Sequence, residues 1–366
     1  MGINTNSSQR NYGIDLLRLV AAFYVIILHT FVQGGLFAAT APYSYQSFSC
    51  KMLMICGYCT INIFGIISGF VGYREPERKF TFSGYASLWI DVVFYSVALT
   101  LIFMYIRPDA VTTADLVSML FPVTKNLYWY FSAYTLVYFL APFLNRMIQH
   151  CSEKELKLLF FLICFIIVPM DYICGCFSFE NGYSALWLIL LYLIGAIMKK
   201  NKLGFNIRPA AAFIGIIGLN ACLLLLITKW PHIVLLNSDI YFSFEFRETL
   251  VSPFFLGSAI LHVILFSQIH PNHFAKKLIA FAAPASFAVY IVNVQQCVWL
   301  YFMKDRFAPW AASSPVGIIV RTLSFSFLFV LAVTAADFCK RKLFRILKIH
   351  VVLQKLETIL CKAPVG

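Results

Sequence analysis

Long apolar runs alternate with short polar connections along the whole chain. A helix needs about twenty predominantly apolar residues to cross the hydrocarbon core of a bilayer. Ten runs approach that length, and we predict transmembrane helices near 14–33, 52–73, 84–106, 127–146, 156–173, 184–198, 209–228, 249–268, 278–302 and 316–338. The pattern therefore predicts an all-α, polytopic membrane protein with about ten transmembrane helices.

The connections between these runs are too short to hold a soluble domain. No Gly/Ser-rich linker or low-complexity tract interrupts the series, so we expect one membrane domain over residues 1–366. The first ten residues are polar, and no small-residue cleavage site follows the first apolar run. We therefore expect the first span to remain as an anchor between an N-terminal segment, 1–13, and the rest of the chain, which ends in a basic tail, 339–366.

The first run, GIDLLRLVAAFYVIILHTFVQ at 13–33, carries three polar residues that fall on one helical face. At about 100° and 1.5 Å per residue, Arg18 and His29 lie within about 20° of each other, and Asp15 lies within about 40° of His29. The ends of this stripe are roughly 16 to 21 Å apart along the axis. Ionisable residues inside a membrane usually mark a pathway or a reaction site. Two structural alternatives stay open: an Asp15–Arg18 ion pair at the helix start, and a neutral His29 bonded to a neighbouring helix.

Basic residues outnumber acidic ones, and their location predicts the orientation of the chain. There are 29 Lys and Arg against 16 Asp and Glu, a net charge of +13. Only 12% of residues are charged, about half the fraction of a soluble protein. With an even number of spans, both termini share a side that holds twenty of the basic residues, against seven on the other side. By the positive-inside rule both termini are predicted to be cytoplasmic. We assign this charge to topology and anionic-lipid contact, with a cytoplasmic polyphosphate ligand as the alternative, and we expect no nucleic-acid partner.

Polar residues inside the later spans form two groups by predicted depth. Asp91, in the third span, joins Asp15 and Arg18 at the inner end. The outer group consists of His29, Asn293, Gln296, Arg321 and Glu248. The span limits predict a shared depth for these residues, and they do not by themselves predict contact.

Three further patterns have structural interpretations. The small residues in Ser68-Gly69-Phe70 predict a close approach of two helices. The aromatic run at 128–131 predicts a belt at the outer membrane interface. The eleven cysteines follow no metal or disulfide spacing, although Cys174 and Cys176 flank a glycine in a short loop. We therefore expect no metal site, and we expect most cysteines to be small buried hydrophobes.

The Asp15, Arg18 and His29 pattern resembles the Arg-x10-His signature of the acyltransferase-3 family of integral-membrane O-acyltransferases. Further segments resemble that family in the same order. They are FGIISGF at 64–70, YWYFSAYTLVYFLAPFLN at 128–145, GYSALWLILLYLIGA at 182–196 and SFAVYIVN at 286–293. The likeness extends over nearly the whole chain.

The resemblance implies transfer of an acyl group, most often acetyl from cytoplasmic acetyl-CoA, to a hydroxyl of a cell-envelope glycan or lipid-linked saccharide. It implies that His29 and Arg18 are the essential pair, with Asp15 beside them. It also implies a multi-pass protein of the bacterial cytoplasmic membrane. Some members carry an appended extracytoplasmic hydrolase-like domain, and we find no such domain in this sequence. We therefore expect any acyl hand-off to a soluble domain to need a separate envelope protein, and a homo-oligomer is the other partner considered.

Two departures from the family pattern affect the expected sites. Many members begin the third span with Arg-x-x-Arg, where this chain reads YASLWIDVVFYS. The donor-binding candidates are therefore Arg74, Arg78 and Lys79 upstream, together with Asp91. Many members end the ninth-span motif in His, where this chain has Asn293.

A physical mechanism follows from these expectations. His29 is the candidate base that deprotonates an acceptor hydroxyl during attack on the thioester. Asn293 or Gln296 is the candidate oxyanion donor, with Arg321 and Glu248 near the acceptor. A secondary transporter or flippase with an intramembrane Asp/Arg/His path is the alternative class. The two halves of the chain show no inverted repeat, which disfavours a transporter.

Overall fold

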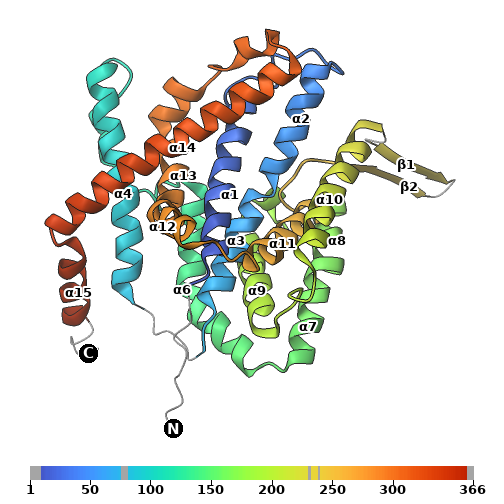
Figure 1. The fold of residues 1–366 in the computed structure, drawn as a ribbon, viewed down its shortest axis with the longest axis horizontal. Coiled ribbons are helices and arrows are strands. Elements are labelled where there is room, and N and C mark those ends of the chain that lie inside the picture. Colours follow the sequence, from blue (N-terminus) through green and yellow to red (C-terminus); the bar gives the residue numbers. More distant parts are fainter. Residues whose placement is uncertain (1–9, 76–80, 230–231, 238–239, 361–366) are drawn as a thin grey trace. The chain divides into compact units, whose positions relative to one another are not determined.

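The computed structural model describes residues 10–75, 81–229, 232–237 and 240–360. The chain divides into two compact units. Unit 1 comprises Met1–Ala21, Tyr58–Arg78 and Leu140–Ala283, and unit 2 comprises Ala22–Gly57, Lys79–Phe139 and Pro284–Gly366. The helices α1 (Tyr12–Phe31) and α6 (Trp129–His150), labelled in Figure 1, are each divided between the two units, and the last residue of α2, Tyr58, falls in unit 1.

Unit 1 is mainly helical. Besides the first turns of α1 and the end of α6, its elements are α3 (Thr60–Gly72), α7 (Glu153–Leu162), η1 (Ile163–Ile167), α8 (Val168–Cys174), η2 (Glu180–Gly182), α9 (Ala185–Asn201), α10 (Pro209–Lys229), β1 (His232–Asn237), β2 (Ile240–Glu245), α11 (Pro253–Ser267) and α12 (His273–Ala282). Side-chain caps satisfy the free N–H groups at several helix starts. Ser152 and Glu155 form a capping box at α7, and Asn272 Oδ1 accepts from Ala275 N at 2.9 Å at α12.

Close packing of α3 against α9 forms the centre of unit 1. A Cβ atom at Gly69 would collide with the Tyr192 carbonyl, and one at Gly195 would collide with the Ile66 carbonyl. Glycine at these positions lets the two backbones approach closely, as small residues do between membrane helices. This is the close approach predicted from Ser68-Gly69-Phe70.

A two-stranded hairpin departs from the all-α prediction. β1 and β2 pair antiparallel, with His232 opposite Glu245 and Asn237 opposite Ile240 (Figure 1). The segments HIVLLN and IYFSFE are rich in β-branched and aromatic residues, which favour strands. The hairpin occupies the connection between the predicted spans at 209–228 and 249–268.

Unit 2 is also helical. Its elements, besides the second part of α1 and the start of α6, are α2 (Tyr45–Tyr58), α4 (Phe82–Ile106), α5 (Thr113–Ser118), η3 (Ala283–Ala285), α13 (Ser286–Val294), η4 (Val298–Met303), η5 (Ala308–Ala312), α14 (Pro315–Ile346) and α15 (Ile349–Leu360). Helix α13 packs against both α4 and α14. Glu357 of α15 accepts from Phe82 N at 2.8 Å and from the Ser83 hydroxyl at 2.5 Å, which caps the N-terminus of α4 with a carboxylate.

Among the described residues, seven helical stretches are long and apolar enough to cross a membrane. They are Tyr12–Phe31, Tyr45–Gly72, Phe82–Ile106, Glu153–Cys174, Pro209–Lys229, His273–Val294 and Pro315–Ile346. Helix α11 is apolar but shorter, at 15 residues. The helical, multi-pass architecture is confirmed, while the count of ten spans stays a prediction.

The aromatic run at 128–131 does not form the predicted interfacial belt. Tyr128 and Phe131 are 1% and 0% exposed. The Tyr128 hydroxyl lies 2.6 Å from the Ser96 hydroxyl on α4. The belt prediction was wrong here because Tyr128 has a polar partner inside unit 2 and can therefore be buried.

Candidate active site

A charged cavity of about 720 Å³ lies beside the start of α1 in unit 1. Basic side chains outnumber carboxylates on its wall, where Arg10, Arg18, Arg74, Lys199 and Lys200 face Asp15 and Glu75. Phe70 and Tyr73 add aromatic surface. A concave site of this volume with excess positive charge is suited to a drug-sized anionic ligand.

Asp15 organises two of the arginines in this cavity. Its Oδ1 accepts from an Arg18 terminal nitrogen at 2.8 Å, and its Oδ2 accepts from Arg10 Nε at 2.5 Å. The Asp15 side chain is only 8% exposed, whereas Arg18 is 31% exposed. The expected Asp15–Arg18 ion pair is therefore present, and it uses one of the five N–H donors of the Arg18 guanidinium.

The start of α1 is fixed by the residue before it. Asn11 Oδ1 accepts from Ile14 N at 3.1 Å, as an N-cap side chain does. Asn11 Nδ2 donates to the Ser267 carbonyl at 3.0 Å, which ties α1 to the end of α11. Gly13 packs so closely on the Phe266 carbonyl that a Cβ atom would collide with it. These contacts set the position of Asp15 and Arg18 one turn further along the helix.

The opposite wall of the cavity comes from α3, the residues after it, and the end of α9. Lys199 Nζ lies 4.9 Å from the centre of the Phe70 ring, a cation–π distance. Lys200 Nζ donates to three carbonyls at the end of α6: Ile148 at 2.6 Å, Gln149 at 3.0 Å and Cys151 at 3.1 Å. Lys200 therefore stabilises a helix C-terminus, as cations do.

A second polar site lies on the later part of α1, in unit 2. His29 Nδ1 makes a short hydrogen bond with Asn293 Oδ1 of α13. Because an amide oxygen can only accept, His29 donates from Nδ1, and this leaves Nε2 with its lone pair. Asn293 is fully buried, while His29 is partly exposed. The two residues, which were predicted only to share a depth, are thus in direct contact.

Asn293 also has a hydrogen-bond donor that the described structure does not use. Its Nδ2 is buried and has no hydrogen-bond partner among the described residues. A buried, unpaired amide donor beside an imidazole is costly in a folded protein and therefore needs an explanation. A reacting oxygen at this position would receive that hydrogen bond.

The surroundings of His29 are held by the segment after α13. The Trp299 ring lies edge-on to the imidazole, with ring centres 4.8 Å apart. Gln33 Nε2 donates to the Trp299 carbonyl at 3.0 Å. The Gln33 carbonyl accepts from Asp305 N at 3.0 Å. Gln33, two residues after the end of α1, is therefore bonded to residues 299–305 through both its side chain and its backbone carbonyl.

The predicted ninth span, 278–302, is interrupted two residues after Asn293. Gln295 has an extended backbone (φ −57°, ψ 132°) between α13 and η4. Its side-chain oxygen accepts from Cys297 N at 2.8 Å and Val298 N at 3.1 Å, and its Nε2 donates to the Thr100 hydroxyl at 3.0 Å. The buried Gln295 amide thus replaces the backbone bonds that the break removes, as membrane interiors require.

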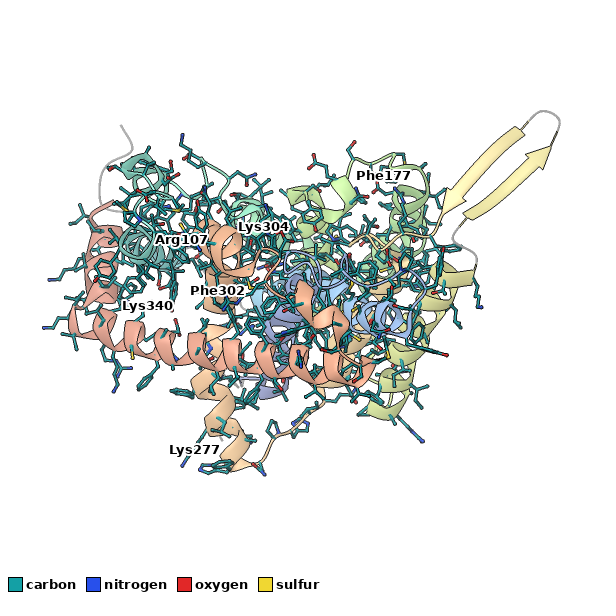
Figure 2. All side chains as sticks on the ribbon, turned by 90° about the horizontal axis from the view of Figure 1, so that it is seen from above. Arg107, Phe177, Lys277, Phe302, Lys304 and Lys340 are labelled. Carbon is teal, nitrogen blue, oxygen red and sulfur yellow. The ribbon has the colours of Figure 1, made fainter. Side chains whose placement is uncertain are left out.

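The remaining predicted residues lie elsewhere. Asp91 Oδ1 pairs with Lys340 of α14 at 2.8 Å, in unit 2 rather than in the cavity of unit 1. Figure 2 labels Lys340 on α14. Gln296 and Arg321 are exposed residues of unit 2, and Glu248 is a partly exposed residue of unit 1. Arg74 lines the cavity with Arg18. Arg78 and Lys79 lie outside the described residues.

Several residues that build these sites were not predicted from the sequence. Asp337 joins the Asp91–Lys340 pair: its Oδ1 accepts from Lys340 Nζ at 2.9 Å and from the Tyr95 hydroxyl at 2.8 Å. Gln295, rather than its neighbour Gln296, is the buried amide. The signal available for Asp337 was its i,i+3 spacing to Lys340, which places both on one helical face.

The fold and these two sites define a polytopic helical membrane protein with ionisable and amide groups inside its spans. The family model described as an acyltransferase domain matches residues 11–349, and the chain belongs to that acyltransferase family. Comparisons with curated proteins and with solved structures gave no match. The resemblance to the acyltransferase-3 family is thereby confirmed.

Proposed function

We propose that this protein is a membrane O-acyltransferase that moves an acyl group, acetyl in the first instance, from acyl-CoA to a hydroxyl of a cell-envelope glycan or lipid-linked saccharide. The observation that carries the proposal is the His29–Asn293 pair. It combines an imidazole whose Nε2 keeps its lone pair with a buried amide donor that is unused in the described structure, in a chain that belongs to an acyltransferase family.

His29 acts as the general base in this proposal. A hydroxyl becomes an effective nucleophile when a positioned base removes its proton during attack, and Nε2 of His29 is the nitrogen left for that task. The thioester carbonyl becomes a tetrahedral oxyanion, which Asn293 Nδ2 is suited to stabilise. Collapse of this intermediate releases the CoA thiolate, and the proton held by His29 passes to the thiolate. Gln296, Arg321 and Glu248 stay candidates for contact with the acceptor.

The cavity of unit 1 is the proposed site for the anionic part of the acyl-CoA. Its excess of cationic groups complements the phosphates of the nucleotide end. Arg18 and Arg74 are the first candidates for these contacts, with Asp15 as the group that orients Arg18. Arg78 and Lys79 stay candidates from the sequence. Asp91 is a weaker donor-binding candidate because Lys340 already pairs with it.

Orientation and location complete the proposal. We place the protein in a bacterial cytoplasmic membrane, with ten spans and both termini in the cytoplasm. The excess of basic residues on the side of the termini in the predicted topology supports this orientation. α1 then runs outward, and Arg18 and His29 are about 16 Å apart along its axis. An extended pantetheine arm, roughly 15 to 20 Å long, has a comparable reach. The chain acts as a single membrane domain, alone, as a homo-oligomer or with a separate envelope protein.

The proposal is tested with purified protein in detergent. Acetyl-CoA carrying a heavy-isotope acetyl group is supplied with an envelope oligosaccharide, and CoA release and acceptor mass are both followed by mass spectrometry. We expect the acceptor to gain one heavy acetyl group for each CoA released, and His29→Ala to lower both signals by about 10²- to 10⁴-fold. A wild-type protein that binds acetyl-CoA without cleaving the thioester would refute the function.

Oriented vesicles test the proposed sidedness. Acyl-CoA is placed only on the side of the termini, and a non-permeant acceptor only on the other side. Acylated acceptor in the outer compartment supports transfer across the membrane. Product that forms only when both substrates share the side of the termini would overturn the proposed path and leave the acyltransferase activity intact.

One observation favours a second candidate function. The helix interrupted at Gln295 is a feature that transporters use at their binding sites. A transporter or flippase would move a solute across liposomes without consuming acyl-CoA. Counterflow of a labelled saccharide in the absence of any acyl donor would support this candidate, and strict dependence of the product on thioester cleavage would exclude it.

A further inference from the structure

Two exposed cysteines flank the glycine that ends α8. Cys174 is the last residue of this helix, and Cys176 follows Gly175. Both thiols are exposed, unlike the buried Cys50, Cys59 and Cys297. Phe177, the next residue, is labelled on this loop in Figure 2. Neither cysteine lines the charged cavity of unit 1.

The backbone at Gly175 brings the two Cα atoms within disulfide range. Gly175 is left-handed, with φ 64° and ψ 21°, close to the mirror image of a helical residue. The distance between the Cα atoms on either side of a residue depends on that residue's φ and ψ, and mirror images share it. Helical geometry therefore gives about 5.4 Å between Cys174 and Cys176. Disulfides span roughly 4.4 to 6.8 Å between Cα atoms.

The left-handed turn also brings the side chains together. Residues two apart on a continuous α-helix do not face each other. Here the Cys176 thiol is hydrogen-bonded to the Cys174 thiol, and this hydrogen bond raises the pKa of Cys176 above its ordinary value. Cys174 Sγ also donates to the Met170 carbonyl at 2.9 Å.

Asp171 holds the turn in this conformation. Its carbonyl accepts from Gly175 N at 2.7 Å, and its Oδ1 accepts from Phe177 N at 2.8 Å. These bonds fix the backbone on both sides of Cys176. The two exposed thiols therefore lie on either side of one defined turn, where α8 ends.

We propose that Cys174 and Cys176 form a redox modification site, a dithiol that converts reversibly to an intramolecular disulfide. A thiolate of the pair attacks an external disulfide and displaces one thiol from it. The second cysteine then attacks the mixed disulfide and displaces the other thiol. The protein loses two hydrogens and two electrons, and the external disulfide gains them as two free thiols. The reactant is thus a low-molecular-weight or protein disulfide.

Other cysteines of the chain supply the comparison. Cys339 on α14 is exposed like the pair, and it has no neighbouring cysteine in the sequence. It can form a mixed disulfide with glutathione but no local intramolecular one. Cys56 and Cys59 have the more familiar C-x-x-C spacing, yet Cys59 is fully buried. Exposure together with the left-handed turn distinguishes Cys174 and Cys176.

The test uses the full-length protein in nanodiscs equilibrated with reduced and oxidised glutathione. Samples are acid-quenched, alkylated with N-ethylmaleimide and analysed by peptide mass spectrometry. We expect the peptide with Cys174 and Cys176 to lose both alkylation sites together and to be two hydrogens lighter. An intramolecular disulfide releases two glutathione molecules, so its fraction falls when total glutathione rises at a fixed ratio. The Cys339 adduct depends only on the ratio and stays constant.

Separate glutathione adducts on the two cysteines, with the same constant response as Cys339, would overturn the proposal. This result requires only the wild-type protein. The variant Cys176→Ser provides a second check. In this variant we expect Cys174 to behave as Cys339 does. Loss of the Cys174 alkylation site without an adduct would mean that its partner is another cysteine, and the assignment would be wrong.

Discussion

Replacing Asn293 with alanine removes the acceptor that holds the Nδ1–H of His29. The structure ties the two side chains through one short hydrogen bond, and it leaves Asn293 Nδ2 as an unused buried donor. Removing one oriented hydrogen-bonding group from an acyl-transfer site typically lowers kcat by about 10²- to 10³-fold. We expect a loss of that size for Asn293→Ala, with the KM for acyl-CoA nearly unchanged because the cavity of unit 1 is intact.

A double-mutant cycle separates the two contributions of Asn293. His29→Ala should lower kcat by about 10²- to 10⁴-fold, the usual worth of a general base. If Asn293 acts only by holding His29, the double variant should be no slower than His29→Ala alone. If Nδ2 also stabilises the oxyanion, the double variant should lose a further measurable factor. Asn293→Asp keeps an acceptor for His29 and removes the Nδ2 donor, while its carboxylate makes the imidazole more basic. A lower kcat in this variant therefore reports the loss of Nδ2 and not of the acceptor for His29.

The assay is heavy-acetyl transfer to the acceptor under saturating acyl-CoA. Asn220→Ala, the same substitution in a membrane helix of unit 1, is the matched control and should retain wild-type kcat. Leaving the His29 donor unpaired costs about 1 to 3 kcal/mol of stability, so thermal unfolding is measured for each variant. A folded Asn293→Ala protein with wild-type kcat would refute the proposed role of the pair.

Three further outcomes are expected. Arg18→Ala should weaken acyl-CoA binding by about 10- to 100-fold, the contribution of a charged hydrogen bond. Arg18→Lys should recover only part of this affinity, because a lysine ammonium does not replace the planar, multiply donating guanidinium. Unchanged affinity in calorimetry would contradict this. Lys340→Met should destabilise the protein by about 3 to 5 kcal/mol, since it leaves Asp337 buried with one partner fewer, and an unchanged unfolding midpoint would contradict it. Cys174→Ala should remove the hydrogen bond that is the main cause of the raised pKa of Cys176, so more thiolate is present at a given pH. Maleimide labelling of Cys176 should then be faster near pH 8, and a slower rate would contradict this.

The helical architecture follows from apolar run length, which is why the sequence predicts it well. Each of the ten predicted ranges contains helix. The hairpin β1–β2 was missed because run length carries no signal for strands outside the membrane. The helical face of α1 was also predictable, since spacing alone places Asp15, Arg18 and His29 together.

Partners distant in sequence were harder to predict. Depth along the spans predicted that Asn293 and His29 lie at the same level, but it did not predict their contact, which joins residues 264 positions apart. The same reasoning could not choose between Gln295 and Gln296, because the choice depends on a helix break that no glycine or proline marks. Asp91 was assigned to the donor site from its predicted depth at the inner end of the third span. Depth could not identify its partner Lys340, which is 249 residues away. Depth orders the residues along the membrane normal, and packing decides which of them meet.

Among the fully buried amides, hydrogen-bond satisfaction separates Asn62 and Gln295 from Asn293. Asn220, whose Oδ1 also lacks a partner in the described structure, is only partly buried. Asn62 is fully buried, and both ends of its amide are used: Nδ2 donates to the Leu250 carbonyl at 2.8 Å, and Oδ1 accepts from Trp187 Nε1 at 3.0 Å. Gln295 is satisfied in the same way at the helix break. Asn293 is equally buried and has one end unused in the described structure. Under the proposed function, the oxygen of the reacting thioester carbonyl would accept the hydrogen bond that Asn293 Nδ2 leaves unused.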